Sequence, residues 1–178
     1  MNQGSWRRDI VVGMIGWAVM CTVGPVVIQH REMTPITLQT LVLFFFSILG
    51  GPRVGAIVSV GYMICAWSGL PVGAGYMVVK GYLHIGFFFG LIIAAILLGS
   101  LAQTDFFTRS WTQILLWLLG HAVVLCIGVM GMSRFHPDAW KQLNYLMPGA
   151  LVKSALGALL VQAFRKLIDA RNKKSIQL

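Results

Sequence analysis

Acidic side chains are scarce in this chain. Only five of its 178 residues are Asp or Glu, against fourteen Lys or Arg, and charged residues make up 11% of the sequence. A soluble domain is usually about 25% charged. Because hydrophobic residues reach 57% and the mean hydropathy is +0.79, most of the surface must be apolar and its solvent is lipid. The composition predicts a membrane protein.

Motifs for catalysis, metals and nucleotides are missing as well. Cys21, Cys65 and Cys126 lie in apolar segments without CxxC spacing, so we interpret them as small buried hydrophobic residues rather than disulfides or zinc ligands. All five acids lie outside the apolar segments, and no Ser/His, HExxH or P-loop arrangement occurs. We therefore expect no enzyme activity, no cofactor and no ATP site. Without a basic stretch interleaved with aromatics, we expect no nucleic-acid partner.

Six apolar segments predict transmembrane helices, since a span needs roughly 20 apolar residues, or fewer when neighbours shelter it. The second and third are short, and Gly50-Gly51-Pro52 between them predicts a tight hairpin. The sequence thus predicts an all-α membrane protein in which residues 1–178 form a single domain. We expect the helices at 10–28, 37–49, 54–68, 82–101, 111–130 and 147–164.

Basic residues predict the orientation. With both termini inside, nine basic residues lie on the cytoplasmic side and four outside, as the positive-inside rule requires. We therefore expect an N-in, C-in, multi-pass protein of a bacterial-type cytoplasmic membrane, whose remaining positive charge contacts anionic lipid. The inner set is Arg7, Arg8, Arg53, Arg109, Arg165, Lys166, Arg171, Lys173 and Lys174, and the outer set is Arg31, Lys80, Arg134 and Lys141.

Lys153 is the one cation inside a predicted span, where a charge costs a few kcal/mol and usually faces a cavity or a partner. Its helical neighbours Gly149, Ala150 and Gly157 are small and leave a notch beside the ammonium group. A ligand carboxylate or carbonyl fits there. Alternatively, the stem snorkels to the outer interface, about 9 Å along the axis from this position.

Other polar residues of the spans have less specific interpretations. Thr37 and Gln39 lie in the outer half of the second helix, where Gln39 either ties helices together or binds a ligand, and helix contact is the commoner role. His84 and His121 are interpreted as packed or interfacial residues near helix ends. The glycine-rich outer loop 69–81 is either a lid over a cavity or a surface connection.

Five motifs together resemble the BioY family, the biotin-specific membrane components (S-components) of energy-coupling-factor (ECF) transporters. The resemblance runs from residue 34 to residue 160, and the order and spacing of the motifs carry it. They are PITLQTL at 35–41, GPRVG at 51–55, GLPV at 69–72, GYL at 81–83 and PGALVK at 148–153.

The resemblance implies an S-component-like bundle of six helices that captures biotin from outside. It implies that Lys153 belongs to the pocket and that the loop after the third helix covers the ligand. It also implies separate ATPases and a coupling subunit, either dedicated or shared, while self-association is the alternative. Small residues on the first helix, here Gly13, Gly16 and Ala18, commonly face that subunit. The candidate substrate-binding residues are Thr37, Gln39, Gly69, Leu70, Pro71, Val72, Tyr82, Gly149, Ala150 and Lys153.

One departure from the family pattern concerns the pocket. Family members usually carry Gly-Asp-x-x-Lys in the sixth helix, and here Ala150 takes the place of the Asp. An Asp would neutralise Lys153 and accept a hydrogen bond from a ureido N–H, and an unpaired buried donor costs about 1–3 kcal/mol. Biotin is therefore the expected ligand, with another small carboxylated metabolite as the neighbouring alternative. A non-transporting membrane scaffold is the alternative from another class.

Overall fold

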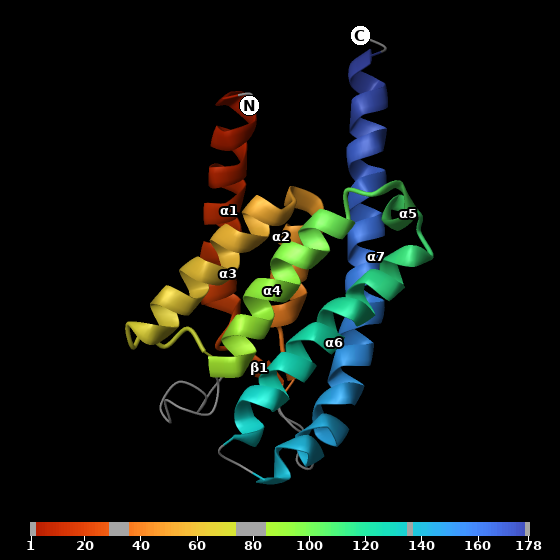
Figure 1. The fold of residues 1–178 in the computed structure, drawn as a ribbon. Helices are drawn as coiled ribbons and strands as arrows, with labels where there is room; N and C mark the ends of the chain where they lie inside the picture. Colours follow the sequence, from red (N-terminus) through yellow and green to blue (C-terminus); the bar gives the residue numbers. More distant parts are fainter. Residues whose placement is uncertain (1–2, 29–35, 74–84, 135–136, 177–178) are drawn as a thin grey trace.

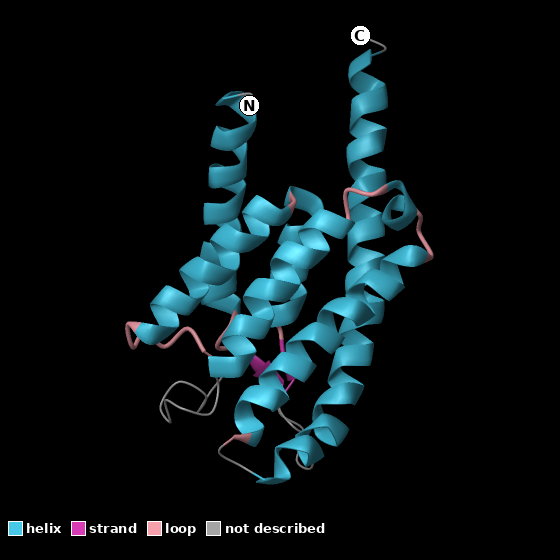
Figure 2. Cartoon of the chain, in the orientation of Figure 1, coloured by secondary structure: helices cyan, strands magenta, loops and turns pink. Residues whose placement is uncertain are grey.

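The chain folds into a helical bundle with one very short strand pair, in a computed structural model that describes residues 3–28, 36–73, 85–134 and 137–176. Val27 and Ile28 pair antiparallel with Thr37 and Ile36, and these strands are the magenta pieces in Figure 2. The elements in chain order are α1 (Gln3–Val23), β1 (Val27–Ile28), β2 (Ile36–Thr37), α2 (Gln39–Gly50), α3 (Pro52–Trp67), α4 (Ile85–Leu101), α5 (Asp105–Thr108), α6 (Thr112–Ser133), the 3-10 helix η2 (Pro137–Lys141) and α7 (Gln142–Ile176).

Both chain ends lie at the same end of the bundle, called here the terminal end (Figure 1). The turn between α2 and α3 and the connection from α4 through α5 to α6 lie at that end too. The strands, the end of α3 and η2 lie at the opposite end, called the far end (Figure 1). The six longer helices α1, α2, α3, α4, α6 and α7 therefore run alternately between the two ends.

Two helices of the described residues are long and apolar enough to cross a membrane by length and composition. One covers Thr112–Ser133, and the other is the stretch 137–171 that contains most of α7. Helices α2, α3 and α4 are apolar but shorter, at 12, 16 and 17 residues. Apolar helices this short need neighbouring helices for shelter in order to cross a membrane.

The predicted hairpin between the second and third helices is confirmed. The backbone of Gly51 has a φ of 89°, a conformation that residues with a Cβ rarely adopt, and its N–H donates to the Ser47 carbonyl at 2.8 Å. Pro52 then stands at the first position of α3, where its missing N–H costs no hydrogen bond. This turn sends the chain back toward the far end.

The bounds of three predicted helices are wrong. The first covers Gln3–Val23 rather than 10–28, because the polar and charged residues before 10 are helical and Gly24-Pro25 interrupts the helix before β1. The second begins at Gln39, so Thr37 belongs to β2. The last extends far beyond 147–164, since the charged residues after 164 are good helix formers and Pro148 stands early in α7 without ending it.

The small residues of α1 pack inside the chain. A Cβ at Gly13 would overlap the Ile57 side chain, and a Cβ at Gly16 would lie 2.8 Å from atoms of Phe46 and Val58. Ala18 is exposed. The expectation that Gly13 and Gly16 face a coupling subunit is therefore wrong, because α3 and α2 already occupy that side of the helix.

Candidate functional site

The start of α2 brings two polar side chains into the far half of the bundle. The first is Gln39, whose Nε2 donates to the Tyr62 hydroxyl on α3 at 2.5 Å and lies 3.5 Å from the Gly24 carbonyl. The Tyr62 hydroxyl in turn donates to the Val72 carbonyl at 3.0 Å. Gln39 therefore ties together the segment after α1, α3 and the residues that follow α3.

Residues 69–72 close the end of α3 in a Schellman motif. The Gly69 N–H donates to the Ala66 carbonyl and the Leu70 N–H to the Cys65 carbonyl, both at 3.2 Å. The motif needs a left-handed residue, which Gly69 supplies with a φ of 80°. Gly69, Leu70 and Pro71 are exposed while the Val72 side chain is buried, so the segment turns back into the bundle at its last residue.

Thr40, the second polar residue of α2, belongs to a buried cluster with His121 of α6 and Ser154 of α7. The Nε2 atom of His121 lies 3.1 Å from the Thr40 hydroxyl. Its Nδ1 lies 3.0 Å from both the Trp117 carbonyl and the Ser154 hydroxyl. The three side chains are at most 7% exposed. One hydrogen-bonded cluster therefore joins three helices in the interior.

The acceptors of this cluster fix its proton positions. Because the Trp117 carbonyl can only accept, Nδ1 of His121 carries the proton in the neutral ring and Nε2 is an acceptor. The Thr40 hydroxyl must then donate to Nε2, and the Ser154 hydroxyl donates to the Ala150 carbonyl at 2.8 Å. Every buried polar atom of the three side chains therefore has a hydrogen-bond partner, and the cluster as a whole is uncharged.

Lys153 lies beside this neutral cluster on α7. Its side chain is half-buried, and its charge acts on His121 across the helix interface. Among the residues that the structure describes, Lys153 has no hydrogen bond and no ion pair. Its small neighbours differ in role: Ala150 is buried, Gly149 is half-buried, and the Trp117 ring fills the space over Gly157, where a Cβ would overlap it.

This arrangement is better suited to binding than to catalysis. Ser154 and His121 are hydrogen-bonded, a pair that the sequence analysis did not anticipate, but the remaining histidine nitrogen faces Thr40 rather than a carboxylate. A nucleophile needs a base that a third group orients and a path to substrate, and Ser154 is 0% exposed. What remains is an ammonium group beside hydroxyl and carbonyl groups, which suits recognition of a polar molecule.

The other predicted site residues fall into two groups. Thr37 pairs with Val27 through the short strands, and its side chain is half-buried near the start of α2. Tyr82 and residues 74–81 of the expected lid lie outside the described residues, as does His84. The structure therefore places the polar clusters of α2, α3, α6 and α7, and the first five residues of the loop.

Sequence reasoning missed the Thr40–His121–Ser154 cluster. His121 was expected near a helix end, yet it lies in the middle of α6, where the charge of Lys153 and two hydroxyl groups surround it. A usable signal existed for two members of the cluster, since Thr40 follows the candidate Gln39 and Ser154 follows the candidate Lys153 in apolar segments.

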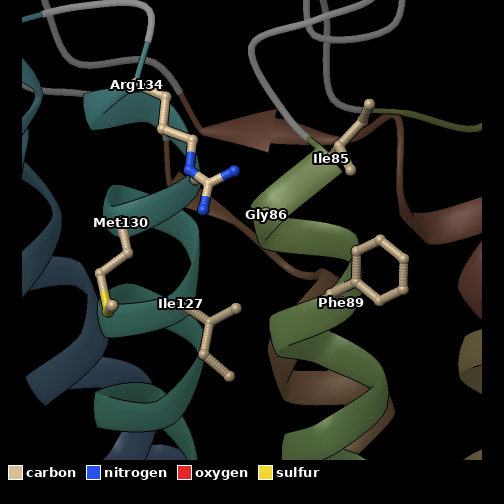
Figure 3. A pocket seen from close by; sticks show the side chains of 7 residues that line it. Ile85, Gly86, Phe89, Ile127, Met130 and Arg134 are labelled. Atoms are coloured by element: carbon tan, nitrogen blue, oxygen red, sulfur yellow. The ribbon is translucent and has the colours of Figure 1, made fainter.

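A groove of about 550 Å³ lies apart from these residues, between α4 and α6 at the far end (Figure 3). Arg134 is the one polar side chain that lines it, and Phe89 and Met130 beside it are about half exposed. The groove opens on the side of the bundle, and none of the predicted site residues lines it. Its lining residues are Ile85, Gly86, Phe89, Ile127, Met130, Gly131 and Arg134.

An apolar helical bundle that encloses a hydrogen-bonded polar cluster beside an ammonium group has the construction of a membrane protein that recognises a small polar ligand. The model of the BioY family matches residues 1–170, so the chain belongs to the BioY family. This is a family of membrane transporter components, which confirms both the predicted membrane class and the expectation that the chain is not an enzyme.

A solved structure shares the fold. It is the 2.1 Å crystal structure of the S-component for biotin from an ECF-type ABC transporter, with a TM-score of 0.76 over 93% of this chain and 95% of that one. The two sequences are 21% identical, so the likeness establishes the S-component fold. No curated protein matches the chain.

Proposed function

We propose that the chain is the substrate-binding membrane subunit of an ECF-type vitamin uptake system, with biotin as its substrate. Membership of the BioY family and the fold of a biotin S-component support the class. The observation that carries the site is Lys153, whose ammonium group has no protein partner among the described residues. It lies beside the neutral Thr40–His121–Ser154 cluster, whose hydrogen bonds are already made within the protein. A ligand carboxylate or carbonyl supplies the missing partner.

The length of α7 favours this role of Lys153 over snorkelling. The helix begins at Gln142, eleven residues before Lys153, which is roughly 16 Å at 1.5 Å per residue. A four-carbon stem is too short to bring the ammonium group to that end. The group therefore stays in the interior near His121, and we propose that a ligand supplies the opposite charge or the hydrogen-bond acceptor that it lacks there.

The proposed binding residues form two layers. Lys153, with Gly149 and Ala150 one turn away, forms the polar floor on α7, and Thr37 of β2 and Gln39 of α2 form the second layer. We assign Gly69, Leu70, Pro71 and Val72 to the start of the cover, and Tyr82, which lies outside the described residues, to the same cover. The Thr40–His121–Ser154 cluster holds α2, α6 and α7 at the spacing that this floor requires.

The proposed topology has six membrane spans, α1, α2, α3, α4, α6 and α7, within a single domain of residues 1–178. The common position of the two chain ends at the terminal end supports an even number of crossings (Figure 1). The excess of basic residues at that end supports its placement on the cytoplasmic side of the membrane. A coupling subunit and ATPases, or a second copy of the chain, would meet the bundle from that side.

A second candidate substrate, another small carboxylated metabolite, is favoured by one specific observation. Ala150 is 7% exposed, so the position that usually carries an Asp is a neutral methyl group enclosed by the bundle. A ureido N–H would find no carboxylate there. A ligand with a carboxylate for Lys153 and an apolar body against Ala150 would lose nothing.

The test is ligand-dependent thermal stability of the purified, detergent-solubilised protein. A ligand at a hundred times its dissociation constant should stabilise the native state by about 2.7 kcal/mol and raise the melting temperature. Biotin should do so, and biotin amide, which lacks the carboxylate charge, should do so less if Lys153 binds the carboxylate. A panel of carboxylated metabolites tests the second candidate.

Two matched variants make the test specific to the site. Lys153→Met should weaken biotin binding about tenfold to a hundredfold, because a hydrogen bond to a charged group is worth about 1.5–3 kcal/mol. Lys166→Met changes the same residue type on the exposed part of α7 and should leave binding unaltered. Equal affinities in the two variants would remove Lys153 from the pocket, and no response to any metabolite would favour a scaffold.

A further inference from the structure

Helices α1 and α3 run side by side in the same direction, and their contacts repeat in a fixed register (Figure 1). Gly13 of α1 faces Ile57 of α3, and one helical turn later Trp17 faces Gly61, where a Cβ would lie 2.9 Å from the indole ring. Each pair is separated by the same number of positions in the sequence. One further step of four residues in both helices pairs Cys21 with Cys65.

The two thiols do interact across this interface. Cys21 is half-buried, Cys65 is 9% exposed, and both are free. Each stands two residues before the end of its helix, or about 3 Å from the far end of the helix. The third cysteine, Cys126, is exposed on α6, so the expectation that all three are buried is wrong for that residue.

We propose that Cys21 and Cys65 are an oxidisable dithiol that forms a reversible disulfide between α1 and α3. The register of the two helices carries this assignment, because it places both cysteines at the same level of the α1–α3 interface. It supersedes the interpretation of these two residues as inert apolar side chains.

The chemistry is thiol–disulfide exchange with an external disulfide oxidant. The thiolate of Cys21, the more exposed of the two, attacks one sulfur of the oxidant, expels a thiolate and forms a mixed disulfide. The thiolate of Cys65 then attacks the Cys21 sulfur and expels the second thiolate of the oxidant. Two protein thiols are oxidised, two oxidant sulfurs are reduced, and the two protons pass to the released thiols.

The position of the pair gives the disulfide a consequence for the proposed binding site. The Cys65 carbonyl accepts the Leu70 N–H at the start of the proposed cover, and Tyr62, one turn earlier, bonds to Val72. A bridge to Cys21 would fix the end of α1 beneath this segment. This consequence rests on the proposed function. The proposed topology also places the pair near the outer, more oxidising side of the membrane. Formation of the disulfide itself depends on neither.

The experiment uses the purified full-length protein with Cys126→Ala, which leaves only the pair. After treatment with oxidised glutathione and denaturation in the presence of a maleimide, we expect no labelled cysteine, and an intact mass lower by two hydrogen atoms. Treatment with a reductant before denaturation should restore two labelled cysteines. Monomeric mobility on a non-reducing gel should show that the bridge is intramolecular.

A shifted thiol provides the matched control. In the Cys126→Ala background, Cys21→Ala combined with Thr22→Cys moves the thiol about 100° around α1, onto an exposed face. This variant should keep both labelled cysteines or form dimers. Two labelled cysteines in the unshifted protein, a glutathione adduct that never resolves, or equal bridging by the shifted variant would each overturn the proposal. Biotin binding is measured separately, so its failure would leave this result intact.

Discussion

The two ends of the bundle handle polar groups in opposite ways. At the terminal end, charges are paired: the Asp9 carboxylate lies 3.6 Å from Arg53 and 3.8 Å from Arg8, and the Arg53 guanidinium lies 5.7 Å from the centre of the Trp6 ring. In the far half, the Lys141–Asp138 ion pair of η2 is exposed, at 2.8 Å. In the interior of this half, the polar contacts of Gln39, Thr40, Tyr62, His121 and Ser154 are hydrogen bonds between neutral groups, and the ammonium group of Lys153 stands beside them without a partner among the described residues.

The difference follows from access to water. Both arginine side chains at the terminal end are roughly half exposed or more, so solvent supports their charge whether or not Asp9 is present. The hydroxyl and imidazole groups of Thr40, Tyr62, His121 and Ser154 are buried, so their hydrogen bonds go to one another, to Gln39 and to nearby backbone carbonyls rather than to water. A stable scaffold has no use for a lone ammonium group in such surroundings, and for this reason we assign Lys153 to the proposed binding site.

The largest effect on stability is expected from His121→Leu. The substitution removes the acceptor of the Thr40 hydroxyl, and a buried donor without a partner costs about 1–3 kcal/mol. Thermal or denaturant unfolding in detergent measures the loss. Lys153 would remain in place, so this variant tests the neutral cluster rather than the charge.

A double variant separates the hydrogen bond from packing. Thr40→Val in addition to His121→Leu removes both partners of the bond, and such paired removal is much less costly than leaving one partner alone. We therefore expect the double variant to recover part of the stability lost in His121→Leu. A further decrease instead would show that the cluster contributes mainly by packing.

Ala150→Asp should strengthen biotin binding by about tenfold, which corresponds to about 1.4 kcal/mol. The new carboxylate would stand one turn from Lys153 and provide an acceptor for a ureido N–H. Ala150→Asn has the same shape without the charge and should gain less. Titration calorimetry compares the three proteins, and weaker binding in both variants would favour the carboxylated-metabolite alternative.

A smaller effect is expected from Tyr62→Phe, about 1 kcal/mol of stability. The phenol is 1% exposed, and its loss leaves the Val72 carbonyl without its donor and Gln39 without its nearer acceptor. The control Tyr145→Phe removes the same hydroxyl at an exposed position of α7 and should be neutral. Equal unfolding curves for the two variants would mean that solvent reaches this end of α3.

The sequence predicted the fold well because its strongest signals are local. Apolar length and the Gly50-Gly51-Pro52 turn are properties of contiguous segments, and each describes a helix or a connection. The motifs around Thr37 to Leu41 and before Lys153 led to the correct family. Helix ends were less predictable, since α7 continues through charged residues that no hydropathy pattern marks as helical.

The site was predictable only in part because its contacts are not local. Thr40, His121 and Ser154 are far apart in the sequence, and their hydrogen bonds depend on how three helices pack. The notch beside Lys153 was inferred from one helix alone, so nothing indicated that the Trp117 ring from α6 would occupy the space over Gly157. Lys153 itself could be singled out from the sequence, because a charged residue within an apolar segment is recognisable without knowledge of its contacts.

Asp9→Asn, the corresponding change at the terminal end, should have the smallest effect. The sequence analysis placed Asp9 outside the first span, but Asp9 lies within α1 and is 8% exposed. If its ion pairs are buried, losing them should cost much stability, whereas ion pairs supported by solvent should cost little. The N–O distances of 3.6 and 3.8 Å exceed those of a good hydrogen bond, and the partners reach solvent. We therefore expect a loss below about 1 kcal/mol that disappears at high salt. Unfolding at low and high salt measures it, and a salt-independent loss as large as that of His121→Leu would show that both ends depend on buried polar contacts.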